Sequence, residues 1–219
     1  TRSSAVTGVQ TCALPISNKV RLSGVILSEP VLSEEINGEK IYQMTVRVAR
    51  LSDAVDEIKV RVSDRFICFP ELHSGVCVDI TGSIRTRNVW REDHKRKSLD
   101  LTVFCSSIEV CEPEMCENVV ELDGVLSKES FLRRAKTGNR RVCEQLVRND
   151  RGYNKCSFIP VVFWGRNAEY VSSLAKGTKV HCTGRLQSRR YFKRTTESGV
   201  SPIEGITYEV VVSNVELLA

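Results

Sequence analysis

The chain repeats itself once along its length, and this repeat limits the possible folds more than any other feature. Three pairs of segments match in the same order: 18–25 with 118–125, 75–87 with 177–189, and 101–103 with 208–210. Three matches in one order predict a tandem duplication of a module of about 100 residues. The fold is therefore expected to be one small module built twice.

The duplication also predicts the domain boundaries. Residues 18–110 and 118–219 form the two modules, and the short acidic segment 111–117, which contains Pro113, is the expected linker. Residues 1–17 carry one charge and show no clear period. We expect them to lie outside the fold as an artefactual or disordered leader, with a natural N-terminal arm as the alternative.

Each module has the pattern of strands. Branched and apolar residues alternate with polar ones in five stretches per module, which is typical of half-buried strands. The expected strands are 20–23, 41–48, 58–62, 76–84 and 99–104, and then 119–122, 142–147, 158–164, 178–186 and 208–212. A short helix is expected after each third strand, around 66–72 and 167–174, where Ala168, Val171 and Leu174 share one helical face.

Five strands with a helix after the third are the pattern of an oligonucleotide-binding (OB) barrel. Gly82 and Gly184 interrupt the fourth strands. A glycine inside a strand indicates a bulge or a close backbone approach, as a tight barrel needs. The predicted fold class is all-β with one short helix per module, arranged as two tandem five-stranded OB-fold barrels.

The second module resembles the bacterial single-stranded DNA-binding protein family over essentially its whole length. The matching residues are Asn118, 122–124, 161–165, 168–171, 176–177, 184–189 and 208–212. The first module matches more weakly, through 18–20, 22–24 and 82–87. This resemblance implies binding and protection of single-stranded DNA, without sequence preference, in replication, recombination and repair.

The resemblance also implies partners. The family packs four barrels together, as a homotetramer or as a dimer of tandem chains, so a homodimer with four barrels is expected here. RNA stays open as a second ligand, and a primosome-type adaptor that chiefly binds proteins is the alternative function. The family's acidic, Phe-ended tail, which recruits replication and repair enzymes, has no counterpart after 215–219. Either the reading frame is incomplete or the protein lacks this recruiting function.

The charge of the chain is unevenly divided. The formal net charge is only +5, yet residues 118–219 carry 17 Lys and Arg against 10 Asp and Glu, whereas residues 18–110 carry 14 of each. A basic surface attracts phosphates, and the loops after strands one and four border the binding face of this barrel class. The candidate phosphate-binding residues of the second module are Arg140, Arg141, Arg148, Lys155, Arg185, Arg189, Arg190, Lys193 and Arg194.

Aromatic residues supply the candidate base-stacking positions. Alternation places Phe158 and Trp164 on one face of the third strand, together with Pro160 and Val162, and leaves the aliphatic residues and Phe163 to the core. By resemblance, Phe158, Trp164 and Tyr191 occupy the family's stacking positions. Phe192 and Tyr153 are further candidates.

The first module keeps fewer of these residues. Its third strand offers Glu57, Lys59, Arg61 and Ser63 on the corresponding face, with no ring. Its candidates for nucleic-acid binding are Arg85, Arg87 and Trp90, at and after the fourth strand. Because the charges of this module balance, we expect it to contribute less to nucleic-acid binding than the second module, or to serve mainly in assembly.

Other functions find little support in the sequence. Nine Cys, an odd number without C-x-x-C spacing, indicate reduced thiols in a cytoplasmic protein rather than a disulfide scaffold. The family resemblance implies that this cytoplasmic protein is nucleoid-associated. Three scattered His and no paired Cys ligands argue against a metal site. Phosphate-loop, nucleophile-elbow and zinc-protease motifs are absent from the sequence, so we expect neither a cofactor nor an enzyme.

Overall fold

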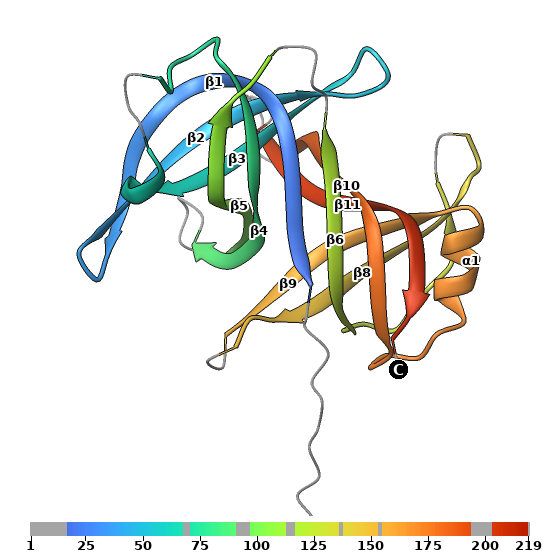
Figure 1. The fold of residues 1–219 in the computed structure, drawn as a ribbon. Helices are drawn as coiled ribbons and strands as arrows, with labels where there is room; N and C mark the ends of the chain where they lie inside the picture. The colour runs from blue at the N-terminus through green and yellow to red at the C-terminus, as the bar shows by residue number, and fades with distance from the viewer. Residues whose placement is uncertain are drawn as a thin grey trace, which may run out of the picture.

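The computed structural model describes residues 17–67, 71–90, 97–112, 117–135, 138–152, 155–193 and 203–218. This part of the chain forms two barrels side by side (Figure 1). The first contains β1 (Asn18–Ile36), β2 (Glu39–Ala49), β3 (Val55–Ser63), β4 (Cys77–Trp90) and β5 (Lys97–Val110). The second contains β6 (Asn118–Leu126), β7 (Arg133–Arg134), β8 (Arg141–Asp150), β9 (Cys156–Trp164), α1 (Arg166–Ser172), β10 (Lys179–Lys193) and β11 (Ile203–Leu217).

Both barrels close by the same route. The first runs β2-β3-β5-β4-β1 and closes through β1–β2, and the second runs β8-β9-β11-β10-β6 and closes through β6–β8. The pairs β3–β5 and β9–β11 are parallel, and the others are antiparallel. The core consists of alternate side chains such as Leu22, Ile80, Leu122 and Phe163, which are fully buried. The predicted fold class of two tandem OB-fold barrels is confirmed.

The fourth strands bend at the predicted glycines. The register of β4 with β5 shifts between Thr81 and Gly82, and that of β10 with β11 shifts between Thr183 and Gly184. A Cβ added at Gly82 would lie 2.4 Å from a backbone oxygen of β5, and one added at Gly184 would lie 2.3 Å from a backbone oxygen of β11. Only glycine allows this close approach of the two strands.

The helix of the second barrel forms as predicted. Gly165 has a φ of 58°, which favours glycine, and turns the chain from β9 into α1. Ala168 and Val171 are fully buried, and Leu174 packs against the core. The helix contacts β8, β9 and β11, so its apolar face covers one end of the barrel.

The first barrel differs from the prediction at this point. A 3-10 helix, Asp64–Phe66, follows β3, and Ile67 returns to an extended conformation with φ −95° and ψ 120°. The predicted helix over 66–72 therefore does not begin at Phe66. Residues 68–70 of the predicted range lie outside the described residues.

The two barrels share one continuous sheet, because β1 pairs with β6 (Figure 1). Val20 lies opposite Val120, Asn18 opposite Leu122, and Leu22 opposite Asn118. The repeat aligns each of these residues of β1 with the residue 100 positions later, so the pairing is self-complementary like the interface of a symmetric dimer. The duplication thus places the interface of a symmetric dimer within a single chain.

Two asparagines repeat the same contact in both barrels. Asn118 donates from Nδ2 to the carbonyl of Leu186 at 2.8 Å and accepts from its N–H at 2.8 Å. Asn18 makes the same two bonds to Ile84, at 2.9 and 2.8 Å. Each side-chain amide therefore takes the place of backbone hydrogen bonds between the first and fourth strands of a barrel, at the point where the two barrels meet.

Candidate nucleic-acid interface

Strand β9 presents aromatic side chains on the outer face of the second barrel. Ile159, Val161 and Phe163 point into the core and are buried. Phe158 and Trp164 lie on the opposite face, where Phe158 exposes 39% of its surface and Trp164 is half-buried. The predicted alternation along β9 is confirmed, although Val162, which shares the outer face, is also buried.

The Trp164 ring lies beside a cation. The Arg140 guanidinium carbon is 5.5 Å from the centroid of this ring, within the range of a cation–π contact. Trp164 lies opposite Val142 of the neighbouring strand β8. This arrangement puts a flat ring and a positive charge next to each other on the outer surface. A nucleotide can use both, because its base stacks on the ring and its phosphate is neutralised by the cation.

Phe158 lies where the second barrel meets the first. It is opposite Arg148 on β8, and Arg148 pairs with Asp150 at 3.2 Å. The backbone N–H of Phe158 donates to the hydroxyl of Thr86 of β4 at 2.9 Å. The ring is therefore fixed at the junction between the barrels rather than on a free loop.

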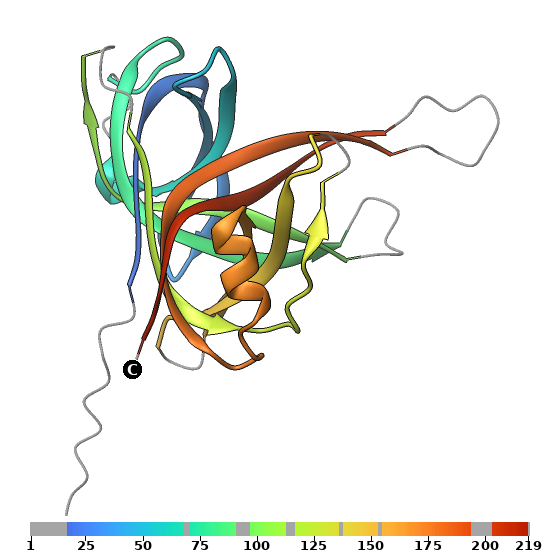
Figure 2. The ribbon, with the colours of Figure 1, turned by 90° about the vertical axis from the view of Figure 1, so that its right-hand side faces the viewer.

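The hairpin of β10 and β11 carries the third candidate ring. Figure 2 shows this hairpin extending from the same side of the molecule as that of β4 and β5. A Cβ added at Gly205 would come 2.5 Å from Cζ of Tyr191, so the Tyr191 ring lies directly over this glycine. Arg189, two residues before, lies 3.7 Å from Glu209. The hairpin thus carries a ring and a cation near each other.

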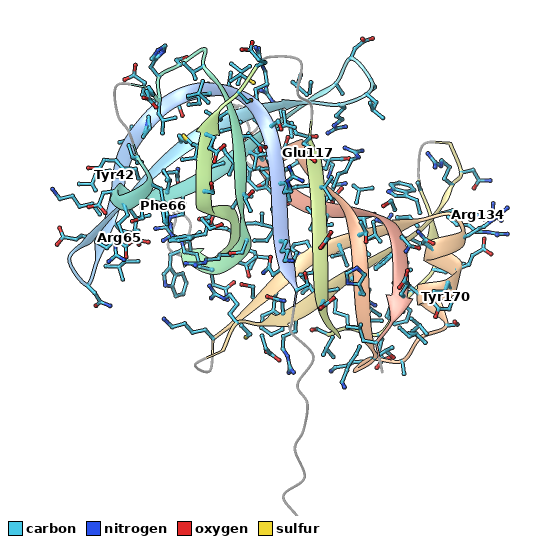
Figure 3. All side chains as sticks on the ribbon, viewed as in Figure 1. Tyr42, Arg65, Phe66, Glu117, Arg134 and Tyr170 are labelled. Atoms are coloured by element: carbon cyan, nitrogen blue, oxygen red, sulfur yellow. The ribbon has the colours of Figure 1, made fainter. Side chains whose placement is uncertain are left out.

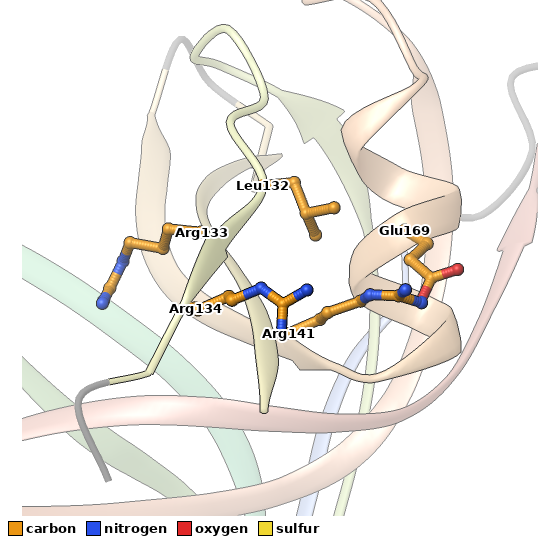
Figure 4. A pocket seen from close by; sticks show the side chains of 5 residues that line it. All are labelled: Leu132, Arg133, Arg134, Arg141 and Glu169. Atoms are coloured by element: carbon orange, nitrogen blue, oxygen red, sulfur yellow. The ribbon is translucent and has the colours of Figure 1, made fainter. Parts of the chain in front are cut away.

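A basic hollow opens between β7, β8 and α1 (Figure 4). Its volume is about 440 Å³, and its lining residues are Leu132, Arg133, Arg134, Arg141 and Glu169. Arg141 pairs with Glu169, and Arg133 pairs with Glu144. Arg134 lies at the far end of the second barrel (Figure 3). It forms no ion pair within the described residues, and its side chain points across the hollow toward Arg141 (Figure 4).

The sequence interpretation missed one exposed ring in this region. Phe131 exposes 75% of its surface and precedes the basic pair Arg133 and Arg134 by two residues. An aromatic residue close to two arginines in the sequence is the signal that could have identified it. Phe131 precedes β7 in a stretch without strand periodicity, so alternation does not mark it.

Two predicted phosphate-binding arginines instead contact carboxylates of the first barrel. Arg185 lies 3.7 Å from Asp56, and its burial, the largest effect, together with the charge of Arg50 lowers the pKa of its guanidinium. Arg190 pairs with Glu57 at 2.6 Å. Sequence alternation could not show these contacts, because the partners come from β3 of the other barrel.

The first barrel buries part of the face that its third strand was expected to offer. Ser63 is fully buried and Arg61 exposes only 7% of its surface, while Glu34 pairs with Arg61. Lys59 pairs with Asp100 at 3.3 Å. This face is covered and charge-compensated, because β1 is long enough to bring Glu34 over it.

The cations of β4 have different surroundings. Arg87 lies between two carboxylates, 3.4 Å from Glu34 and 3.3 Å from Asp100. The Arg85 guanidinium carbon lies 3.4 Å from the centroid of the Phe104 ring. Trp90, at the end of β4, exposes 58% of its surface.

Some predicted residues lie outside the described part of the chain. Tyr153 and Arg194 are not described, and of Phe192 and Lys193 only the backbone, in β10, is described. Lys155 is exposed just before β9. Of the predicted rings of the second barrel, the structure therefore describes the side chains of Phe158, Trp164 and Tyr191, and these remain the candidates for base stacking.

Two further features concern other kinds of site. Within the described residues, no group of three or more His, Cys, Asp and Glu side chains is placed to hold a metal ion. The same residues contain no helix that is long and apolar enough to cross a membrane. The thiols of Cys105 and Cys182 are buried, which raises the pKa of each to about 12.

The sequence and the fold are similar to known proteins. Residues 117–218 match the model of the single-strand binding protein family. A relative from Clostridium acetobutylicum, named single-stranded DNA-binding protein 1, is 38% identical over 81 residues, which are 34% of this chain and 74% of the relative.

Solved structures extend the likeness of fold to both barrels. Wild-type single-stranded DNA binding protein from Thermus aquaticus has a TM-score of 0.74 at 19% identity, covering 93% of this chain and 94% of that one. A deletion mutant of that protein has a TM-score of 0.71 at 21% identity, covering 93% and 95%. Sequence and fold agree, and the chain belongs to the single-strand binding protein family.

Proposed function

We propose that this protein binds single-stranded DNA without sequence preference, chiefly through the outer face of the second barrel. The observation that carries the proposal is the pair of rings on β9, Phe158 and Trp164, partly exposed among arginines. Membership of the single-strand binding protein family supports the same function.

The chemistry of the face suits a ligand of any sequence. Every base has a flat face, so stacking on Trp164, Phe158 and Tyr191 does not depend on which base is present. Arg140 and Arg189 lie beside these rings or along the same hairpin and would neutralise phosphates. Neither contact reads the hydrogen-bonding edge of a base, so affinity without base recognition follows.

A titration tests this proposal directly. Fluorescently labelled oligo-dT is added to the full chain at two salt concentrations, with a duplex of the same length as the control. We expect tight binding of oligo-dT that weakens as salt rises, because counterions are released from the strand. No binding at the lower salt concentration would exclude the function.

The biological setting is a finer proposal. We infer that the protein coats single strands exposed during replication, recombination and repair in the cytoplasm. Neither stacking nor phosphate contacts requires a deoxyribose, so oligo-U serves as the comparison ligand. Binding of oligo-U as tightly as oligo-dT would make RNA an equal ligand.

The assembly is proposed as a homodimer with four barrels. The strands of residues 18–110 close one barrel and those of residues 118–219 close the other, which supports these ranges as two domains with 111–117 as the linker between them in the sequence. The measured mass in solution should then be twice the 24.6 kDa of one chain. A mass of one chain at micromolar concentration would exclude the dimer.

A further inference from the structure

The two barrels touch at two equivalent junctions on either side of the β1–β6 pair. At one junction, which we call the acidic seam, Asp56 and Glu57 of β3 meet Ser188 of β10. At the other, the aromatic seam, Ser157 and Phe158 of β9 meet Thr86 of β4. The repeat makes these residues counterparts: Asp56 with Ser157, Glu57 with Phe158, and Ser188 with Thr86.

The backbone contacts of the two seams are the same. The N–H of Glu57 donates to the Ser188 hydroxyl at 3.0 Å, and the N–H of Phe158 donates to the Thr86 hydroxyl at 2.9 Å. The N–H of Ser188 donates to Asp56 at 2.7 Å, and that of Thr86 donates to Ser157 at 3.4 Å. The seams therefore differ in their side chains and not in their framework.

The arginines of the acidic seam bind the carboxylates of the same seam. Asp56 is fully buried, and Arg50 donates two hydrogen bonds to it at 2.6 and 2.8 Å. Arg185 lies 3.7 Å from the same carboxylate, and Arg190 pairs with Glu57. The carboxylates and guanidinium groups of this seam are bound to one another, so the seam holds the barrels together and its arginines are less available to a polyanion.

The aromatic seam has the opposite character. Phe158 takes the place of Glu57 at this seam. Burial is the main cause that lowers the pKa of the Arg85 guanidinium in β4, and the nearby positive charges of Arg151 and Arg61 lower it further. Nε of Arg85 is buried without a hydrogen-bond partner. Nη1 of Arg185 at the acidic seam also lacks a hydrogen bond, but it lies 3.7 Å from the Asp56 carboxylate.

Within the described residues no carboxylate forms an ion pair with Arg85 or Arg151. Arg61 is paired with Glu34, and the charge of Glu39 acts on Arg85 in the opposite sense without forming an ion pair with it. The guanidinium groups of Arg85 and Arg151 are therefore the ones left to bind an anion at this seam.

We propose that a single-stranded polynucleotide passes from the second barrel to the first over the aromatic seam only, with a base on Phe158 and phosphates on Arg85 and Arg151. The acidic seam is a clamp in which Arg185 and Arg190 bind the first barrel instead of the strand. The inference rests on the proposed function and adds a path to it. It also gives the first barrel, despite its even charge balance, a defined share of the ligand.

The repeat supplies the variants that test this path. Arg85→Gln introduces the residue that the second barrel has at the equivalent position, Gln187, and Phe158→Glu introduces the counterpart of Glu57. Arg190→Asn is the matched control at the acidic seam, because Asn88 is the counterpart of Arg190. Each substituted side chain already occurs in the same strand of the other barrel, which favours folding of the variants.

Two oligonucleotides separate the path from binding itself. A dT strand of about 8 nucleotides occupies one barrel, and one of about 30 reaches both. Arg85→Gln should weaken binding of the long strand about fivefold, change the short strand less than about twofold, and lower the salt slope by about 0.7, the contribution of one phosphate contact. Phe158→Glu should weaken the binding of both oligonucleotides. Arg190→Asn should leave the affinity and the salt slope of both oligonucleotides unchanged.

The outcomes separate the two proposals. If the wild-type chain binds neither strand at low salt, the proposed function fails. The one-sided path is wrong if the wild-type chain binds both oligonucleotides but Arg85→Gln and Arg190→Asn change the affinity for the long one equally, or do not change it at all. Circular dichroism and the melting temperature of each variant show that it is folded, and Arg151→Ala, at an exposed position, gives a second test of the same seam.

Discussion

Trp164 illustrates how a residue acquires a binding role through its place in a strand. It ends β9 on the outer face, while Phe163 beside it fills the core. Arg140 lies over its ring, so stacking and charge act together. Trp90 is more exposed but belongs to the barrel whose cations are mostly compensated by carboxylates.

This contrast gives the first prediction. Trp164→Ala should weaken oligo-dT binding by about 1–3 kcal/mol, the value of one base–aromatic stack, and Trp90→Ala should weaken it less. Equilibrium titration of both variants with the same oligonucleotide measures the difference. Equal losses would contradict the assignment of the main binding face to the second barrel.

Asn118, one of the residues that carry the family resemblance, has a structural role. Its amide makes both hydrogen bonds to Leu186. Asn118→Ala would leave the N–H and carbonyl of that residue unpaired, so we expect the free energy of unfolding to fall by about 1–3 kcal/mol in urea denaturation. Asn214→Ala, at an exposed position, is the control, and an equal change in both would refute this role.

Residue contacts within one strand followed from the sequence, but contacts between barrels did not. Alternation along β9 correctly separated core from surface, because a strand's period of two is local. Arg185 and Arg190 seemed equally available for phosphates, yet they face Asp56 and Glu57. No local pattern encodes a partner that lies about 130 residues away in the chain.

At the scale of elements, the fourth strands decide the shape of both barrels. Each bends at a glycine so that the next strand can pass within contact of its backbone. The sequence predicted this feature, because a glycine inside an alternating strand usually marks a bulge or a close backbone approach. It predicted the short helix after β3 at 66–72, whereas the described 3-10 helix is Asp64–Phe66, because the Ser63 hydroxyl accepts from the N–H of Arg65 and begins the helix earlier.

The glycine bends give a prediction about stability. Gly184→Ala would force its Cβ against the backbone oxygen of Val211, and Gly82→Ala would do the same at Phe104. We expect each to lower the free energy of unfolding by about 1–3 kcal/mol. Thr81→Ala, one residue from Gly82, is the control in the same denaturation experiment. Unchanged stability of both glycine variants would show that the strands can move apart without cost.

At the scale of the whole molecule, the two barrels behave as the halves of a symmetric dimer joined in one chain. The β1–β6 pairing joins them into one sheet, and the two seams lie on either side of it. The repeat predicted two like modules, but the pairing between them depends on edge strands that no sequence period marks. Because both halves of the interface lie within one chain, the two seams can carry different residues. Asp56 at one seam and its counterpart Ser157 at the other are an example of this difference.

Asp56 should therefore matter to the whole molecule. It is fully buried and is bonded to Arg50 and to the backbone of Ser188. Asp56→Ala would leave these groups without their partner, and we expect a loss of about 3 kcal/mol in the free energy of unfolding. The exposed Asp53→Ala is the control. A loss below about 0.5 kcal/mol, the usual range for surface positions, would show that the acidic seam does not hold the barrels together.

The central claim is that single-stranded DNA stacks on the outer face of the second barrel. The chain has two Trp, so Trp90→Phe leaves Trp164 as the only one. The most direct measurement is the fluorescence of this tryptophan while oligo-dT is added at low salt. We predict quenching that saturates with the same affinity as binding of a labelled strand, and fluorescence that stays constant while the strand binds would contradict the claim.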